Sequence, residues 1–310
     1  MLIAVKDGIL EYMDTEKWKA FLAIADFGSL SAAADKLNIS QSGLSYIIKQ
    51  LENEAGFQLF TRSQWQGMTL TAGGHELYSH VAAFINSGNS LQQYISLIND
   101  GLHGELHIAT YESLALSVLP HVIKSFREKH PGVMVFVEEG DNHSIELALK
   151  RNRVDFALTS KRERTGMQWI KLIDDPIRAL INTDNHLAGT DEVLLTELMK
   201  EPFIMCNNVY DYDIHAIMSN NCLIPENIVC YTQNDHNVLE LVSLGLGCSL
   251  LFNQIVVSLK HYDNVAIKSV AAISDDSTIS RELGIVTRKI DAMSPAAKLF
   301  IREIRNFVNR

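Results

Sequence analysis

An apolar heptad seam at residues 77–98 divides the chain into two differently patterned parts. Apolar residues recur there with a 4-3-4-3-4-3 spacing that only Gly88 interrupts. A seam of three heptads on an otherwise polar helix indicates a partner helix, and we expect that helix to come from a second copy of the chain. Packing of the seam on its own domain would produce the same spacing. The predicted dimerisation residues are Leu77, Val81, Phe84, Leu91, Ile95 and Ile98.

Three helices and a hairpin are predicted before the seam. One amphipathic helix ends near Gly28, and a short Ala-rich helix covers Ala32–Leu37. A third helix begins after its capping residue Ser40 and ends at Gly56. Short strands on either side of residues 63–67 predict a small β-hairpin, or wing. This order of elements is that of a winged helix-turn-helix.

The third predicted helix has a polar face opposite its apolar one. Leu44, Ile47, Ile48 and Leu51 would be buried, which leaves small hydrogen-bonding side chains, one aromatic ring and one cation outside. Such a helix fits the major groove of DNA, where side-chain donors and acceptors read the bases. An ordinary solvated face has the same composition. Together with residues of the second helix and the wing, the predicted DNA contacts are Ser31, Lys36, Gln41, Ser42, Ser45, Tyr46, Lys49 and Arg62.

The same region carries a specific set of sequence runs. They begin at Phe21 and continue with Gly28–Ser45, Leu51–Glu52, Gly56–Arg62 and Leu70–Gly73. These runs resemble the N-terminal signature of LysR-type transcriptional regulators. The resemblance covers about sixty residues and agrees with the helix-turn-helix pattern derived from the residues themselves.

The resemblance implies a layout for the whole chain. A winged helix-turn-helix domain at residues 13–70 would be joined by a long dimerisation helix at 71–100 to an α/β effector-binding domain at 104–310. That domain would have two lobes, like those of periplasmic binding proteins. The sequence agrees, because strands alternate with helices after a glycine-rich hinge and are too numerous for one small sheet. The lobes are predicted at about 104–175 with 271–310, and at about 176–270. This alternation favours parallel sheets.

The charge of the predicted DNA-binding part is unusual for its role. Residues 1–103 hold six Lys and Arg against ten Asp and Glu, a net charge of −4, and the whole chain carries −10. Tyr46 and Trp65 stand where members of the family often carry Arg. Because neutralisation of phosphates supplies much of the affinity for DNA, we expect weak binding by each domain alone. Helix N-termini, polar contacts and the presence of several DNA-binding domains in one assembly would strengthen the binding to DNA.

Polar residues follow several of the predicted strands in the α/β part. Ligands bind at the carboxyl ends of parallel strands, and the resemblance implies a small-molecule inducer in this cleft. Any one of these residues could instead cap a helix. The charge of Glu112 at the cleft mouth disfavours a carboxylate and favours an amino-bearing or neutral effector. The predicted effector-binding residues are Thr110, Tyr111, Glu112, Ser113, Thr159, Ser160, Asn207, Asn208, Thr232 and Gln233.

The four cysteines form no C-x-x-C pair, which indicates a reducing compartment rather than a disulfide framework. Cys222 and Cys230 are eight residues apart and leave open a thiol redox sensor on the same scaffold. A reactive thiol needs a neighbouring cation or a helix N-terminus, and no Lys or Arg lies between Lys200 and Lys260. Buried, inert cysteines are therefore the favoured interpretation.

Motifs for catalysis and for metal binding are absent from the sequence. It contains no G-x-G-x-x-G, G-x-S-x-G, G-K-[ST] or H-E-x-x-H motif. His103 with His107, and Asp211 and Asp213 with His215, give incomplete sets of metal ligands. We therefore expect no enzymatic activity, no cofactor and no metal ion.

The sequence also gives no sign of a membrane segment or a signal peptide. The first twelve residues hold only a short apolar run, and the uncharged stretch Leu241–Leu259 is interrupted by Gly, Asn and Gln. This disfavours the remaining alternative, a periplasmic solute-binding protein. We predict a cytoplasmic bacterial transcription regulator. Its expected partners are operator DNA with dyad symmetry, a small-molecule effector, further copies of itself in a homodimer or homotetramer, and RNA polymerase.

Overall fold

The fold is that of a computed structural model of the chain. It divides into two compact units, residues 1–99 with 150–153 and residues 100–149 with 154–310. Each unit has hydrophobic cores of its own. The residues that the structure describes are 14–63, 67–99, 101–206, 214, 218–219, 223–271 and 279–309.

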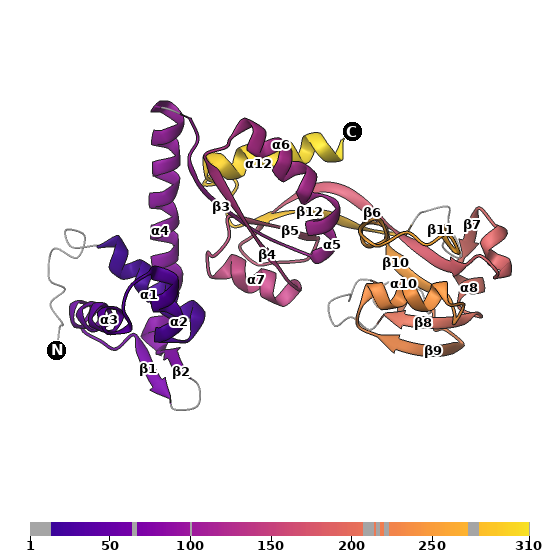
Figure 1. The fold of residues 1–310 in the computed structure, drawn as a ribbon, viewed down its shortest axis with the longest axis horizontal. Coiled ribbons are helices and arrows are strands. Elements are labelled where there is room, and N and C mark those ends of the chain that lie inside the picture. The colour runs from indigo at the N-terminus through magenta and orange to yellow at the C-terminus, as the bar shows by residue number, and fades with distance from the viewer. Residues whose placement is uncertain are drawn as a thin grey trace. The chain divides into compact units, whose positions relative to one another are not determined.

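The N-terminal unit is a winged helix-turn-helix followed by one long helix (Figure 1). The side chains of Asp14, Ser29 and Ser40 cap the first three helices by accepting hydrogen bonds from backbone N–H groups of the first turn. Each of these helices ends at a Gly or Asn in the left-handed conformation. The elements are α1 (Thr15–Phe27), α2 (Leu30–Leu37), α3 (Gln41–Ala55), β1 (Phe60–Ser63), β2 (Gly67–Leu70) and α4 (Ala72–Asn99).

The core of this unit forms where the apolar faces of α1, α3 and α4 meet. Phe21 of α1 is fully buried and packs against the rings of Phe60 and Tyr78. Tyr78 of α4 donates a hydrogen bond of 2.6 Å to Asp26, which holds α4 against α1. Small side chains at the buried positions of α2 let that short helix pack closely.

The wing is attached to the turn between α1 and α2. The backbone N–H of Met68 donates to the carbonyl oxygen of Gly28 at 2.9 Å. Gly67 and Gly28 both have positive φ angles, and a Cβ atom on Gly67 would lie 2.5 Å from the Gly28 carbonyl oxygen. Only glycine fits this close approach at residue 67. Two glycines thus fix the angle at which the hairpin leaves the helices.

Helix α4 carries the predicted apolar seam, and the seam divides into two parts. Leu77 and Val81 pack on the core of their own unit, which is the alternative that the spacing left open. Further along, 61% of Leu91 and 82% of Ile98 are exposed. A row of exposed apolar side chains on one helix is typical of a surface that another chain covers. The exposed seam residues are Phe84, Leu91, Ile95 and Ile98.

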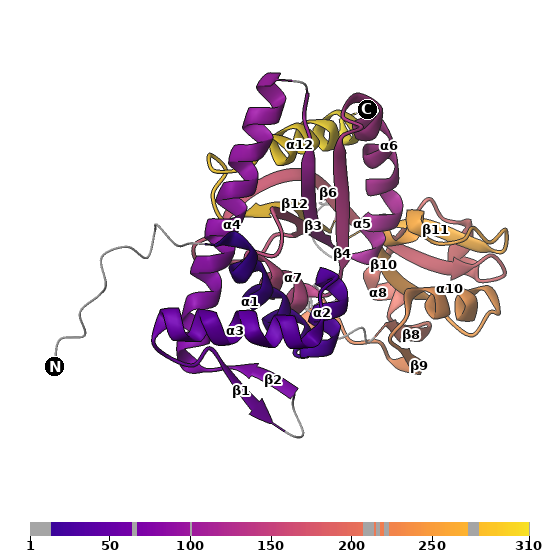
Figure 2. The same ribbon diagram turned by 60° about the vertical axis from the view of Figure 1, so that its left-hand side comes forward.

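The second unit contains an eight-stranded mixed sheet that extends through two lobes. In the first lobe, the side chains of each strand alternate between two cores. Ile108, Phe156 and Ile285 face α6 and α12, which pack together as Figure 2 shows. The neighbouring residues Ala157 and Val286 face α7. The elements are β3 (Gly104–Thr110), α5 (Glu112–Ser117), α6 (Leu119–Lys129), β4 (Val133–Glu139), α7 (Asn142–Lys150), β5 (Phe156–Ser160), β12 (Ser280–Thr287) and α12 (Pro295–Val308).

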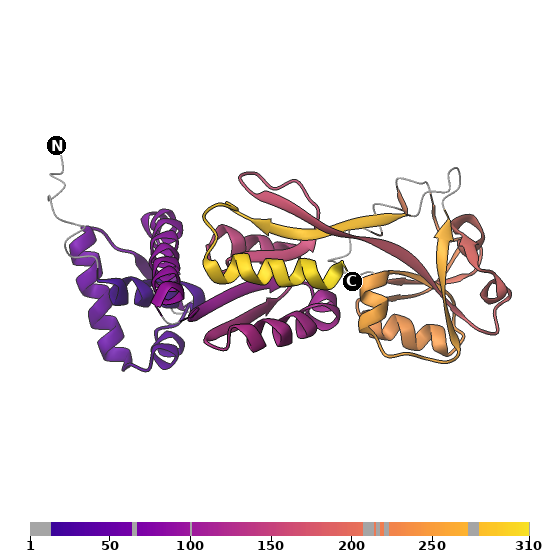
Figure 3. The same ribbon diagram turned by 90° about the horizontal axis from the view of Figure 1, so that it is seen from above.

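The second lobe is built on the far half of a single long strand, β6 (Gln168–Asn182). Residues 168–176 of β6 pair with β12 in the first lobe, and residues 177–182 pair with β10 and β11 in the second. Figure 3 shows this strand passing from one lobe to the other. The other elements are η2 (His186–Gly189), β7 (Glu192–Leu194), α8 (Leu195–Leu198), β8 (Pro202–Cys206), β9 (Asn227–Thr232), α10 (Asp235–Ser243), β10 (Ser249–Phe252), α11 (Asn253–Ser258) and β11 (Val265–Ala271).

Several sequence-based expectations for this unit are wrong in detail. The sheet is mixed rather than parallel, because β12 returns to the first lobe beside β6 and runs antiparallel to both of its neighbours. The sequence predicts one helix at Leu114–His130, but the chain breaks at Val118 into α5 and α6 because Pro120 begins a new helix. The helix that the sequence predicts at Val193–Lys200 is instead the end of strand β7 and the short helix α8. The helix expected at Tyr210–Asn220 lies mostly outside the described residues.

A buried ion pair holds β6 and β12 at the point where β6 leaves the first lobe. Asp175 is fully buried and lies opposite Arg281 in the strand register, with the Arg281 Nε 3.0 Å from the carboxylate. The backbone N–H of Gln254 in α11 donates to the other carboxylate oxygen at 2.8 Å. Burial raises the pKa of Asp175, and the charge of Arg281 opposes this rise. The pair thus joins strands of one lobe to a helix of the other.

We predict that Asp175→Ala lowers the free energy of unfolding by about 3–5 kcal/mol, because it removes the carboxylate that faces a buried guanidinium. The adjacent residue provides a matched control. Asp174 is more than half exposed and pairs with Lys171 at 2.7 Å, so Asp174→Ala should cost less than about 1 kcal/mol. Urea denaturation followed by circular dichroism measures both values. Equal losses in the two variants would contradict this role of the buried pair.

Candidate DNA-binding surface and ligand cavity

The predicted DNA contacts lie on the exposed side of the helix-turn-helix. Gln41, Ser42, Tyr46 and Lys49 are exposed on α3, and 63% of Tyr46 is accessible. Ser45 is half-buried. Ser31 and Lys36 are exposed on α2, and Arg62 on β1. We call the eight residues together the DNA face: Ser31, Lys36, Gln41, Ser42, Ser45, Tyr46, Lys49 and Arg62.

Hydrogen bonds near both ends of α3 hold the wing against that helix. Arg62 of β1 donates to the Ser45 hydroxyl at 3.3 Å. Further along α3, the Glu52 carboxylate accepts from the backbone N–H groups of Leu59 and Phe60 at 2.8 and 3.2 Å. These contacts place the side chain of Arg62 beside the polar side of α3. A groove between α3 and the wing is lined by Ser45, Lys49 and Arg62, among other residues.

The cations of this unit fall into two groups. Lys17 and Lys19 form ion pairs with Glu54 and Glu16 at 2.6 and 2.8 Å. Lys36 and Lys49 form no ion pair with any described residue. Because their charges are not neutralised within the described part of the chain, these two lysines are available to phosphates. The net negative charge of the unit therefore does not extend evenly over the DNA face.

A cavity of about 540 Å³ lies in the second unit, with walls from both lobes. This volume is within the range of small-molecule sites. Four of the predicted effector-binding residues line it, namely Tyr111, Glu112, Ser113 and Gln233. Asn234, another polar residue after a predicted strand, lines it as well, and the walls also contain residues that were not predicted, namely Leu116, Glu139, Gly140, Asp141, Ser144, Asp235, His236, Ile255, Ser258, Leu259 and Arg281.

Two further predicted residues, Thr159 and Ser160, lie behind the cavity wall and do not line it. The hydroxyl of Tyr111 accepts hydrogen bonds from Thr159 at 2.6 Å and from the backbone of Ser160 at 3.3 Å, and donates to Asn142 at 2.5 Å. Thr159 and Ser160 are buried and reach the cavity only through Tyr111. The strand-end rule selects residues of this region, but side chains alternate along a strand and only some of them face the cleft.

The other predicted residues differ in position. Thr110 is fully buried in the strand core and does not line the cavity, and its hydroxyl has no hydrogen-bond partner among the described residues. Thr232 is half-buried and accepts from the backbone of Asn234 at 3.4 Å, so its hydroxyl acts as a local turn contact. Asn207 and Asn208 lie outside the described residues.

Sequence signals existed for some of the residues that were missed. Glu139 ends β4, Asp141 follows it, and Asp235 follows β9, so the strand-end rule applies to them as well. Arg281 had no such signal. It lies at the start of β12, and only the antiparallel return of that strand brings it to the cavity.

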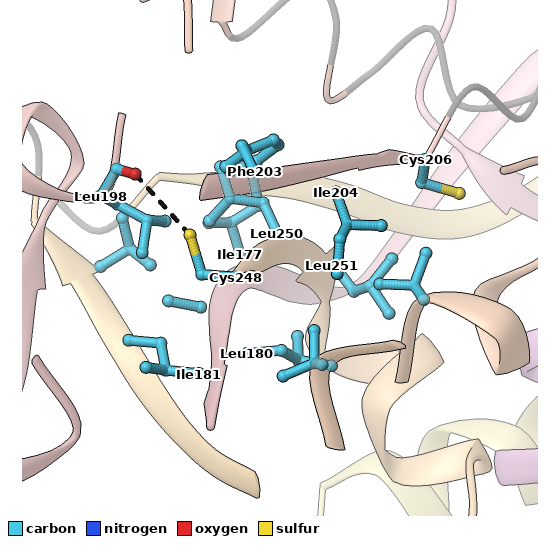
Figure 4. Close-up of a cluster of buried hydrophobic side chains, with 14 of the residues drawn as sticks. Ile177, Leu180, Ile181, Leu198, Phe203, Ile204, Cys206, Cys248, Leu250 and Leu251 are labelled. Atoms are coloured by element: carbon cyan, nitrogen blue, oxygen red, sulfur yellow. Dashed lines mark hydrogen bonds between the residues drawn. The ribbon is translucent and has the colours of Figure 1, made fainter. Parts of the chain in front are cut away.

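The described cysteines form no disulfide, and two of them are buried. Cys248 lies within the apolar core of the second lobe and donates to the carbonyl oxygen of Leu198 (Figure 4). Burial raises the pKa of its thiol to about 12, so it stays protonated and unreactive. Cys206 donates to Asp235 at 3.2 Å. Cys230 is half-buried, and Cys222 lies outside the described residues.

Neither a membrane span nor a metal cluster occurs within the described part of the chain. No helix there is both long enough and apolar enough to cross a membrane. No group of three or more His, Cys, Asp or Glu side chains is arranged there to hold a metal ion. His107, one of the histidines noted in the sequence, lies 3.0 Å from the Glu105 carboxylate and stacks on Phe136. Asp211, Asp213 and His215 are not among the described residues.

A winged helix-turn-helix joined to a two-lobed α/β unit with a ligand-sized cavity defines a class of DNA-binding regulator. Residues 15–75 match the family described as "Bacterial regulatory helix-turn-helix protein, lysR family". Residues 99–309 match the "LysR substrate binding domain". The chain therefore belongs to the LysR family of transcriptional regulators. This confirms the resemblance found in the sequence and the fold class that it implied.

Relatives extend over nearly the whole chain. An "Uncharacterized HTH-type transcriptional regulator YvbU" of Bacillus subtilis strain 168 is 24% identical over 93% of this chain and 97% of its own. The regulator CzcR of Bacillus thuringiensis strain Al Hakam is 29% identical over 81% and 80%. Both relatives are named as transcriptional regulators of the helix-turn-helix type.

Solved structures share the fold. A full-length OxyR variant from Pseudomonas aeruginosa, in which one cysteine is replaced by aspartate, has a TM-score of 0.75 at 18% identity and covers 96% of this chain and 95% of its own. Full-length CbnR in complex with its target DNA has a TM-score of 0.61 at 16% identity, with 95% and 99% covered. At these identities the likeness establishes the common architecture.

We predict that two substitutions on the DNA face have different effects. Lys49→Ala should weaken binding to all DNA sequences and reduce the salt dependence, as the slope of log affinity against log salt, by about one. Tyr46→Ala should weaken binding to the preferred sequence with the slope unchanged, because the residue carries no charge. Fluorescence anisotropy at several salt concentrations measures both quantities.

Lys19→Ala is the matched control for the lysine variant, because Lys19 is paired with Glu16 on α1 and lies outside the DNA face. It should bind DNA like the native protein. If Lys49→Ala and Tyr46→Ala both bind normally while folded, the assignment of the polar side of α3 to DNA is wrong.

Proposed function

We propose that this protein is a dimeric or tetrameric regulator that binds an operator with dyad symmetry through the DNA face. In this proposal α3 enters the major groove and the wing, with Arg62, contacts the DNA backbone. The observation that carries the proposal is the exposed polar side of α3, on which Lys49 has no ion-pair partner among the described residues. Contact with RNA polymerase would follow at a regulated promoter.

Pairing of two chains through α4 is the second part of the proposal. The exposed seam residues Phe84, Leu91, Ile95 and Ile98 would meet the same residues of a second copy. Two DNA faces in one assembly raise the effective concentration of each at the operator. That gain suits a domain whose net charge is negative.

The third part of the proposal assigns the cavity to a small-molecule effector. Its size and its walls from two lobes support this assignment, because a ligand held between lobes can favour one relative arrangement of them. A ligand changes DNA binding only to the extent that it binds the two arrangements with different affinity. Sensing by thiol oxidation receives no support from Cys206 or Cys248, which are both buried.

The test of this function is selection of genomic fragments by the purified full-length protein, followed by binding titrations at several salt concentrations. We expect a recovered site with dyad symmetry that is bound with a shallow salt dependence, since few cations lie on the DNA face. Failure of folded, oligomeric protein to select any fragment would contradict the proposal.

We predict that Leu91→Asp combined with Ile95→Asp yields monomers of 34.7 kDa and abolishes tight operator binding, because two charges would be buried in the helix pair. Asn89→Asp places a charge on the same helix outside the seam and should leave the assembly intact. Size-exclusion chromatography with light scattering gives the masses. An unchanged mass in the double variant would show that chains associate through another surface.

A further inference from the structure

Carboxylates dominate the charge of the cavity. Glu112, Glu139, Asp141 and Asp235 line it, and none of the four forms an ion pair with a described Lys, Arg or His. The guanidinium in the wall belongs to Arg281, and its charge is already matched by the buried Asp175. The acidic side chains and the one arginine of the lining together carry a net charge of −3. Such an environment attracts cations and repels anions.

Two helix N-termini at the cavity are already capped by the chain, and the N-terminus of α5, which has no side-chain cap, carries the carboxylate of Glu112 in its first turn. Asp141 caps α7 by accepting from the backbone N–H of Ser144 at 2.6 Å. Asn234 caps α10 by accepting from the backbone N–H groups of His236 and Asn237 at 2.8 and 3.4 Å. A carboxylate entering the cavity would find these donors already satisfied, although helix N-termini are the usual anion sites in α/β proteins.

Two carboxylates of the wall come from different lobes and act on each other. Glu112 begins α5 in the first lobe, and Asp235 begins α10 in the second. Burial raises the pKa of Asp235, the negative charge of Glu112 adds to the rise, and the hydrogen bond from Cys206 opposes it. A positive charge between the two groups would remove this repulsion and draw the lobes together.

Ser113 provides a separate indication of a ligand at the same place. Its side chain lines the cavity and is only 9% exposed. Its carbonyl oxygen accepts from Ser117, but its hydroxyl group makes no hydrogen bond to any described residue. The hydroxyl is therefore available to a polar group of a ligand in the cavity. The hydroxyl can donate or accept and therefore suits a polar ligand.

We propose that the effector is a small organic cation, with a protonated amine or guanidine group held between Glu112 and Asp235 and a polar group at Ser113. This inference rests on the proposed function of the cavity and names its ligand class. Asp141 and Glu139 contribute long-range attraction at the mouth. Selection against carboxylates follows from the same lining, because an anion would meet unpaired negative charges.

The test measures the thermal unfolding of the full-length protein in the presence of small probes. The probes have four-carbon chains and carry charges of opposite sign. We expect 1,4-diaminobutane or 4-aminobutylguanidine to raise Tm by about 2–4 °C at concentrations several-fold above Kd, and butanedioate to leave it unchanged. The Glu112→Gln, Asp235→Asn double variant should lose this rise. Glu128→Gln removes an exposed carboxylate of α6 outside the cavity, and it should retain the rise.

Two outcomes would overturn the proposal, namely a rise in Tm with butanedioate or no rise with either cationic probe. DNA binding by the same preparations separates this result from the proposed function. If the cations stabilise a protein that selects no genomic fragment, the ligand class stands and the regulatory role fails. If fragments are selected but no cation stabilises the native protein, the regulatory role stands and the ligand class fails.

Discussion

The buried pair of Asp175 and Arg281 is the interaction on which the ligand-binding unit depends. One strand, β6, serves both lobes, and at its crossing point a carboxylate and a guanidinium face each other away from water. Charges are tolerated at that depth only because each meets its counterpart and further contacts complete the site. Gln254 donates to the carboxylate, and the guanidinium lies 3.9 Å from the centre of the Phe252 ring. β12, α11 and β10 are thereby held around β6, and the cavity forms beside them.

The DNA face of the N-terminal unit has few positive charges. Its proposed binding to DNA therefore depends more on the geometry of α3 and the wing. Contacts from Glu52 to the wing backbone and from Arg62 to Ser45 hold α3 and the wing in one arrangement before DNA arrives. An interface that is ordered in advance loses less conformational entropy on binding. The acidic balance also limits attraction to arbitrary DNA, because nonspecific affinity depends chiefly on phosphate neutralisation. Low charge and fixed geometry both favour discrimination between sequences.

Features set by local sequence could be predicted, and features set by distant pairing could not. Ser40 caps α3 as expected, and of the two serines that the sequence offers as caps for the second helix, Ser29 and Ser31, the cap is Ser29. The sequence also predicts a final helix at Pro295–Val308, which is where α12 lies. The tyrosine and acidic residues at the start of α5 were found from the strand-end rule. Arg281 was not, because its place in the cavity follows from an antiparallel return that no local pattern encodes. The sequence predicts a strand only at Ala179–Asn182, the last part of β6, because Asp175 and Pro176 interrupt the apolar pattern. Tertiary contacts stabilise the buried charge.

The continuity of β6 also restricts how the two lobes can move. A flexible loop between lobes would permit sliding and wide opening, whereas a hydrogen-bonded strand has a fixed contour length and resists stretching. It deforms most easily by coiling about its own axis and by gentle flexing. Closure around a ligand would therefore be a rotation of one lobe about the strand, with little translation. A change in the cavity would therefore be transmitted along β6 as a twist of the strand. That twist would act on β10, β11 and β12, which are hydrogen-bonded to β6.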